Sequence, residues 1–347
     1  MPTTISSDLT ALLCDPALVA IVSKQRLRPV EGAGSPFFPP TYLGANGKPT
    51  YCISPLGDGR NLCTVDSVQS QANRIEAAFL EPPYRALVRK VDVTAQLANG
   101  CEKTLDMLQL SHRLADAAVA FSTLAGDANL AMRSFLQGPD ELARLSPMSL
   151  LCGMWASRSE DSQLKIPRAL SATITARNVR ELRRMATFSG SFWSKDLGLE
   201  GKRSAEGLDP VPAAESLGGV VAEGEILRTA ILNLVALRQN CKLPPGAEPA
   251  AAAKYVHGLG LLALTLQPEA FLRQGCLLVG DGEVTVNAVQ RDGTAVALAL
   301  RHDDALAYAQ AAADAFGVAA LAPLAARFQT EKVETPKASK DKPGRSK

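Results

Sequence analysis

The chain of 347 residues carries 37 Lys and Arg against 35 Asp and Glu, and 46% of its residues are hydrophobic. These values are typical of a globular protein with a substantial core, and they exclude a wholly disordered chain. Because no apolar run approaches the ~20 residues that span a bilayer, and the N-terminus lacks a secretory pattern, we expect a cytoplasmic protein without membrane contact.

Patterns typical of catalysis are missing from the sequence. Its seven cysteines show no Cys-x-x-Cys spacing, and its three histidines lie far from them along the chain. We therefore expect reduced thiols and no zinc site. The chain also has no phosphate-binding loop, dinucleotide fingerprint or nucleophile elbow. We expect a protein that is not an enzyme, with no cofactor and no metal.

The N-terminal part begins with a predicted short helix over residues 7–24. A small basic cluster follows, formed by Lys24, Arg26 and Arg28. Residues 32–66 are rich in Gly, Pro, Asn and aromatic side chains, with strand-like pieces around 51–53 and 62–65. This composition is typical of a projecting hairpin or loop, and a packed irregular surface loop is the alternative.

Residues 66–79 predict a helix that is unusually dense in hydrogen-bonding groups. Asp66 followed by Gln69 suggests a capping box. Apolar side chains recur at helical spacing and predict a packed stripe: Val68, Ala72, Ile75 and Phe79. The other faces carry polar groups: Ser67, Gln69, Ser70, Gln71, Asn73, Arg74 and Glu76. Such groups suit a sugar-phosphate backbone, and an ordinary solvated helix face is the alternative.

The middle of the chain predicts an edge strand over 87–93, a long helix over 104–124, a short helix over 140–145 and an apolar strand over 149–155. On the long helix, His112 and Arg113 could touch phosphate or brace the fold. A single histidine without a second base, nucleophile or metal cluster does not indicate catalysis. For Trp155 we expect a place in the core, with stacking on a base as the alternative.

Residues 169–179 predict the clearest strand of the sequence, with a period of two. One face is apolar, with Leu170, Ala172, Ile174 and Ala176, and the other carries Ser171, Thr173, Thr175 and Arg177. Between residues 165 and 184 six basic residues accompany one acid. A sheet face with small hydroxyls and arginines suits RNA, and a plain solvent-facing strand is the alternative.

The remaining elements are a mobile insertion over 188–219, helices over 223–240, 250–266 and 303–316, strands over 275–280 and 284–289, and a disordered basic tail over 330–347. We expect residues 1–329 to form one elaborated domain.

Several segments resemble, in the same order, the backbone subunit of type I-G (formerly I-U) CRISPR effector complexes (Cascade), in the Cas-seven group of the RAMP superfamily. The most specific is DSVQSQANRIE at 66–76; the others are FFPPTY at 37–42, SHRLADA at 111–117, SPMSLLCGMW at 146–155 and KIPRA at 165–169. The resemblance covers about residues 26–278. It implies an α+β fold with an RRM-like (ferredoxin-like) palm, an antiparallel sheet, helical insertions and a protruding thumb-like loop, for which 32–66 is the candidate.

The resemblance also implies a non-catalytic protein whose copies polymerise along a CRISPR guide RNA and present its bases for pairing with a target DNA strand. Its partners would be that RNA, other copies of itself, and the large and other subunits. The predicted RNA-contacting residues are Lys24, Arg26, Arg28, Ser67, Gln69, Ser70, Gln71, Asn73, Arg74, His112, Arg113, Arg168, Ser171, Thr173, Arg177 and Arg180.

Two alternatives stay open. A metal-dependent endoribonuclease that processes precursor CRISPR RNA would need clustered acids or a histidine pair, which the sequence does not show. A purely structural assembly factor would contact only other proteins.

Overall fold

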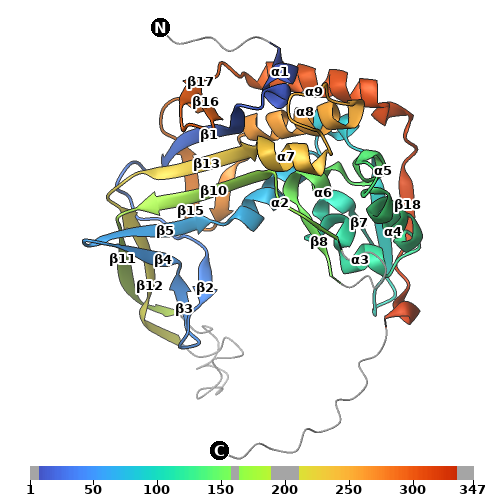
Figure 1. The fold of residues 1–347 in the computed structure, drawn as a ribbon. Helices are drawn as coiled ribbons and strands as arrows, with labels where there is room; N and C mark the ends of the chain where they lie inside the picture. The colour runs from blue at the N-terminus through green and yellow to red at the C-terminus, as the bar shows by residue number, and fades with distance from the viewer. Residues whose placement is uncertain (1–7, 158–163, 189–210, 334–347) are drawn as a thin grey trace, which may run out of the picture.

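The structure is a computed structural model that describes residues 8–157, 164–188 and 211–333. A nine-stranded sheet forms its centre (Figure 1). Its order is β14-β15-β1-β13-β10-β5-β4, with β16 paired to β1 and β17 to β16, and its pairings are antiparallel. The strands are β1 (Leu18–Pro29), β4 (Ile53–Gly57), β5 (Arg60–Asp66), β10 (Leu170–Arg177), β13 (Ile226–Asn233), β14 (Ala270–Arg273), β15 (Cys276–Gly280), β16 (Thr285–Gln290) and β17 (Ala295–Ala297).

Helices cover one face of this sheet. The covering helices are α2 (Val68–Ala78), α7 (Leu234–Asn240), α8 (Ala251–Thr265) and α9 (His302–Phe316), with α9 packed on α8. Strands β10 and β13 alternate between buried and half-buried residues, so each turns every second side chain towards the buried side of the sheet. The mixed α+β class and the antiparallel sheet are thereby confirmed.

A smaller helical region lies beside the sheet (Figure 1). It contains α3 (Ala117–Ala120), α4 (Ala125–Ser134), α5 (Asp140–Leu145), α6 (Pro147–Cys152), the three-stranded sheet β18 (Leu324–Arg327), β6 (Val91–Gln96) and β7 (Glu102–Asp106), and the small pair β8 (Met154–Ala156) and β9 (Leu164–Ile166). The other short elements are α1 (Leu9–Cys14), η1 (Tyr84–Leu87), η2 (Met107–Gln109), η3 (Arg113–Ala115), η5 (Val318–Ala320) and η6 (Thr330–Lys332). No helix among the described residues is long and apolar enough to cross a membrane.

Two hairpins extend from the end of the central sheet, at the lower left of Figure 1. They are β2 (Thr41–Leu43) with β3 (Pro49–Tyr51), and β11 (Val179–Phe188) with β12 (Val211–Ala222). The Gly219 N–H donates to Tyr51 Oη at 3.0 Å. Gly219 has a φ of 95°, and a Cβ there would lie 2.8 Å from the Phe37 carbonyl oxygen, so this junction requires glycine.

The hairpins refine two expectations. Within 32–66, only β2 and β3 form a separate hairpin, whereas β4 and β5 join the central sheet. Residues 211–219, the C-terminal part of the insertion expected over 188–219, belong to β12 and pair with β11. The mobility expected of the insertion stays a prediction. Residues 189–210 and 334–347, which include the rest of that insertion and most of the expected tail, lie outside the described residues. The single-domain boundary at 329 stays a prediction.

Three predicted helices are wrong. In 7–24 only α1 is helical, because Pro16 follows it and the alternating residues from Leu18 pair in the sheet. In 223–240, residues 226–233 form β13 before α7 begins. In 104–124, the left-handed backbone of Arg113, with a φ of 54°, breaks a helix into short turns.

The strand predicted over 149–155 is also mostly wrong. Residues 147–152 form α6, with Pro147 in its first turn, and β8 begins after Gly153. The strand expected over 87–93 begins only at Val91. The helices near 140–145, 250–266 and 303–316 and the strands near 169–179, 275–280 and 284–289 are confirmed.

The buried helix α8 provides a test of the core. Leu262 is fully buried, and Leu262→Ala should lower the free energy of unfolding by about 2–5 kcal/mol because it leaves a cavity. Leu136→Ala, at a side chain that is 80% exposed, is the control and should change it by less than about 0.5 kcal/mol. Urea unfolding followed by circular dichroism measures both, and equal losses would contradict this packing.

Candidate nucleic-acid interface

The helix α2 begins one residue later than predicted. Its N-cap is Ser67, whose Oγ accepts from the Ser70 N–H at 3.2 Å. Asp66 is not the cap: its buried carboxylate accepts from Gln71 at 2.6 Å and from Arg74 at 3.2 Å. The predicted capping box is therefore wrong, because the Asp66 side chain points into the fold.

Gln71 lies on the buried face of α2 rather than on its exposed face. Its side chain is 1% exposed, and its amide oxygen accepts from Arg228 Nε at 2.9 Å. Burial lowers the pKa of Arg228 to about 10, and the Asp66 carboxylate opposes that shift. Gln71 thus joins a buried polar cluster, and the prediction that it contacts RNA is wrong for the chain as folded here. Arg74 is partly engaged too, since it also donates to the carbonyls of Phe271 and Leu272.

Arg113 is a second predicted contact that the fold buries. It is 3% exposed, and it donates to Glu76 through Nε at 2.7 Å and Nη2 at 2.6 Å. A third hydrogen bond runs from its Nη1 to the Gly153 carbonyl at 3.1 Å. Burial raises the pKa of the Glu76 carboxyl, and Arg113 opposes that rise. Arg113 therefore braces the fold, the second of the two roles weighed from the sequence.

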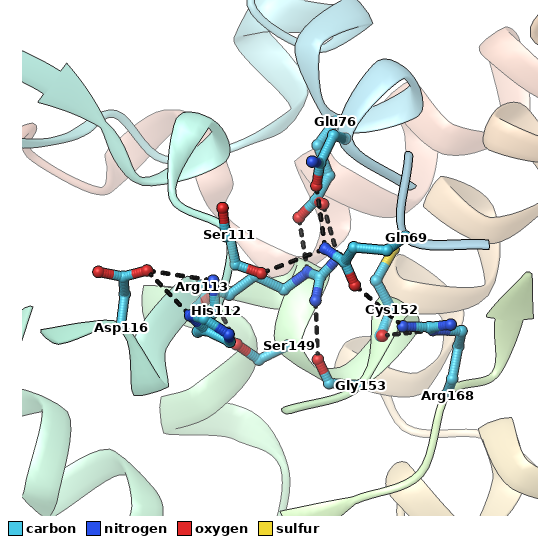
Figure 2. Close-up of polar contacts among 12 residues, drawn as sticks. Gln69, Glu76, Ser111, His112, Arg113, Asp116, Ser149, Cys152, Gly153 and Arg168 are labelled. Carbon is cyan, nitrogen blue, oxygen red and sulfur yellow. Dashed lines mark hydrogen bonds and ion pairs between the residues drawn. The ribbon is translucent and has the colours of Figure 1, made fainter. Parts of the chain in front are cut away.

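Beside this ion pair lies a groove of about 840 Å³, which we call the α2–β8 groove. Its polar rim includes Gln69, His112, Lys165 and Arg168. Figure 2 shows how these groups connect: Arg168 donates to the Cys152 carbonyl at 3.1 Å and to the Gln69 amide oxygen at 3.3 Å. Gln69 in turn donates to the Ser111 carbonyl at 3.3 Å and to Asn73 Oδ1 at 3.0 Å. His112, 76% exposed, lies 3.4 Å from the Asp116 carboxylate.

Trp155 also lines the α2–β8 groove, contrary to its expected place in the core. Its side chain is 67% exposed, because the flanking Met154 and Ala156 occupy the buried face of β8. Lys165, opposite Trp155 on β9, has its Nζ 5.7 Å from the ring centre. Neither residue was among the predicted RNA contacts. Lys165 could have been included from the sequence, because it begins the basic run over 165–184. The exposure of Trp155 could be seen only in the folded structure.

The open face of the central sheet brings together another part of the predicted set. In register, Lys24 on β1 lies opposite Thr229 on β13, and Thr229 lies opposite Thr173 on β10. Ser171 and Arg177 belong to the same face of β10. Lys24 and Arg177 are exposed, and the hydroxyl-bearing residues Ser171, Thr173 and Thr229 of this face are half-buried. The alternation expected for this strand is confirmed.

Three further arginines of the predicted set form ion pairs with acidic side chains near the end of the sheet. Arg26 lies 3.5 Å from Glu225, Arg28 lies 3.6 Å from Asp281, and Arg180 lies 3.7 Å from Glu223. All six side chains are at least 40% exposed, so each pair contributes at most about 1 kcal/mol and leaves its cation accessible. By contrast, no ion pair involves Lys24 or Arg177 within the part of the chain that the structure describes.

The predicted contacts therefore separate into groups. The open sheet face holds Lys24, Ser171, Thr173 and Arg177, the α2–β8 groove holds Gln69, His112 and Arg168, and the sheet end holds Arg26, Arg28 and Arg180. Asn73 is exposed on α2, while Ser67 and Ser70 are half-buried. Among the described residues, no three His, Cys, Asp or Glu side chains gather as a metal site would require.

Residues 21–181 match the family of CRISPR-associated protein GSU0053. The match spans somewhat less than half of the chain and includes β1, α2, the α2–β8 groove and β10. It links this part of the protein to a CRISPR-associated family.

A chain from a solved structure titled "CRISPR RNA-guided surveillance complex, pre-nicking" is 14% identical, with 79% of each chain covered and a TM-score of 0.32. A TM-score this low does not establish a common fold. A comparison with curated proteins gave no match.

The buried Glu76–Arg113 pair can be tested by comparing a single variant with a double variant. Arg113→Met should lower the free energy of unfolding by about 3–5 kcal/mol, because it leaves the Glu76 carboxyl buried without its partner. Glu76→Leu/Arg113→Met should lose less, since both charges are removed together. Urea unfolding measures both. A double variant less stable than Arg113→Met would contradict the assignment.

Proposed function

We propose that this protein is a non-catalytic RNA-binding backbone subunit of a type I-G CRISPR effector complex, built on an RRM-like palm. The observation that carries the proposal is the open sheet face, which lies mostly within the segment that matches a CRISPR-associated family. The segment-by-segment resemblance, from residue 26 to about 278, supplies the subtype.

The chemistry of the open face suits a sugar-phosphate backbone. Lys24 and Arg177 are exposed cations, and Ser171, Thr173 and Thr229 offer small hydroxyls on the same face. Cations attract phosphates whatever the sequence, and hydroxyls can pair with 2′-hydroxyls or phosphate oxygens. None of these short side chains forms a pocket that selects one base. Such a surface would hold the guide RNA while its bases stay free to pair with a target DNA strand.

In the proposed assembly, several copies associate head to tail along one guide RNA. A head-to-tail contact joins two different surfaces of the same chain, so it extends into a filament unless the rotation closes it. The hairpins β2–β3 and β11–β12 project from the sheet and are the candidate thumb. The large subunit and other components would bind this filament.

Removing the two exposed cations of the open face tests the RNA contact. Lys24→Ala/Arg177→Ala should weaken binding of single-stranded RNA to a similar degree for unrelated sequences. The slope of log K against log salt should fall by about 0.7 for each phosphate that the variant no longer neutralises. Fluorescence anisotropy across a salt series measures both quantities.

The matched control is Lys103→Ala/Lys332→Ala, which removes the same charge from exposed residues of β7 and η6. It should leave the salt slope nearly unchanged. If control and test variants weaken binding alike, net charge rather than the open face explains the affinity, and the proposal fails.

The number of bound copies should rise in steps with the length of the RNA. Mass photometry of the protein with CRISPR guide transcripts of increasing length measures this directly. One copy per RNA at every length would contradict a filament. Incubating the same complexes with and without Mg²⁺ or Mn²⁺ checks catalysis, since metal-dependent cleavage of repeat RNA would favour the endoribonuclease instead.

A further inference from the structure

The α2–β8 groove contains an exposed aromatic side chain. Trp155 is the largest exposed side chain of the groove, and it stands on a short hairpin whose backbone is fixed on both sides. Gly153, just before β8, accepts the hydrogen bond from the buried Arg113, and Arg168, just after β9, donates to Cys152. The chain is therefore anchored to the buried core next to both strands of this hairpin.

The surroundings of Trp155 combine apolar and cationic groups. Ala128 and Met132 of α4 are buried side chains that line the groove, whereas Lys165, Arg168 and the paired His112 and Asp116 line its polar side. Within the described residues, no carboxylate forms an ion pair with Lys165. A volume of about 840 Å³ is within the ~300–1,000 Å³ range of small-ligand sites and can take one nucleotide.

These features fit a nucleobase with its phosphate better than an inorganic anion or an apolar peptide. An inorganic anion would make no use of an exposed indole. An apolar peptide would offer no negative group to the cations of Lys165 and Arg168. An indole next to cations suits both parts of a nucleotide, because every base has a face that stacks on an aromatic ring.

We propose that the α2–β8 groove binds one unpaired nucleotide of single-stranded RNA, with its base stacked on Trp155 and its phosphate against Lys165 and Arg168. This site rests on the proposed RNA-binding function and adds a base-contacting position, distinct from the backbone contacts of the open sheet face. The nucleotide that occupies it is withdrawn from pairing with the target strand.

The test uses the fluorescence of Trp155 in the full-length chain. The sequence has two tryptophans, so Trp193→Phe leaves Trp155 as the only one. A 12-nucleotide oligo(A) should quench its emission, because the base stacks on the indole. A ribose-phosphate chain of the same length without bases should bind more weakly and leave the emission largely unchanged.

Affinity supplies the second readout. In the same background, Trp155→Leu should weaken oligo(A) binding about 5- to 150-fold, which corresponds to the 1–3 kcal/mol typical of one base–aromatic stack. Trp155→Phe keeps a ring and should restore most of the affinity. Lys165→Glu should weaken binding of both oligomers, since it acts on the phosphate. Thermal unfolding checks that these variants of exposed side chains fold.

Each remaining outcome decides against the site. If Trp155→Leu binds oligo(A) as tightly as its parent while Lys24→Ala/Arg177→Ala binds weakly, the groove proposal fails and the proposed function stands. If Trp155→Leu impairs only the association of copies, the groove is a protein interface. If the parent binds neither oligomer nor guide RNA, the proposed function fails and the groove proposal with it.

Discussion

The buried ion pair between Glu76 and Arg113 is the contact on which the candidate interface depends. Two ionised groups taken out of water lose hydration worth several kcal/mol each, so they are tolerated only with close and complete hydrogen bonding. The bidentate geometry satisfies Glu76, and the third donor of Arg113 reaches the Gly153 carbonyl. One guanidinium thus ties the last turns of α2 to the strand that carries Trp155.

This arrangement explains why only part of α2, the helix with the most distinctive sequence, is exposed to solvent. On α2, Gln71 and Glu76 point inward to Arg228 and Arg113. Gln69 remains outside, where it contacts Ser111, Arg168 and the exposed Asn73. The inward amide and carboxylate fix the position of the helix. The outward Gln69 then lines the α2–β8 groove, so this one helix carries both core contacts and a groove surface.

The arginine side chains of the protein differ in how accessible they are to solvent. Arg113, Arg228 and Arg238 are buried. Arg113 and Arg238 donate to carbonyls of the core, and Arg228 donates through Nε to Gln71. The arginines at the sheet end form long, exposed pairs, which are weak enough for a phosphate to displace the carboxylate. A net charge of +2 therefore says little about affinity for nucleic acid, because the position of each cation decides it.

The sequence by itself determined the elements whose pattern is local. The period of two in β10 placed its apolar and hydroxyl faces correctly, and the apolar run of α8 gave a buried helix. It did not determine β13 or the turns around Arg113. The residues of β13 are compatible with a helix, but they pair with β1 and β10 instead. Around Arg113 the helix is interrupted by the left-handed backbone of that residue, which contacts Glu76. Only the tertiary structure decided that Gln71 is buried and Trp155 exposed, because both depend on contacts with residues far away in the chain.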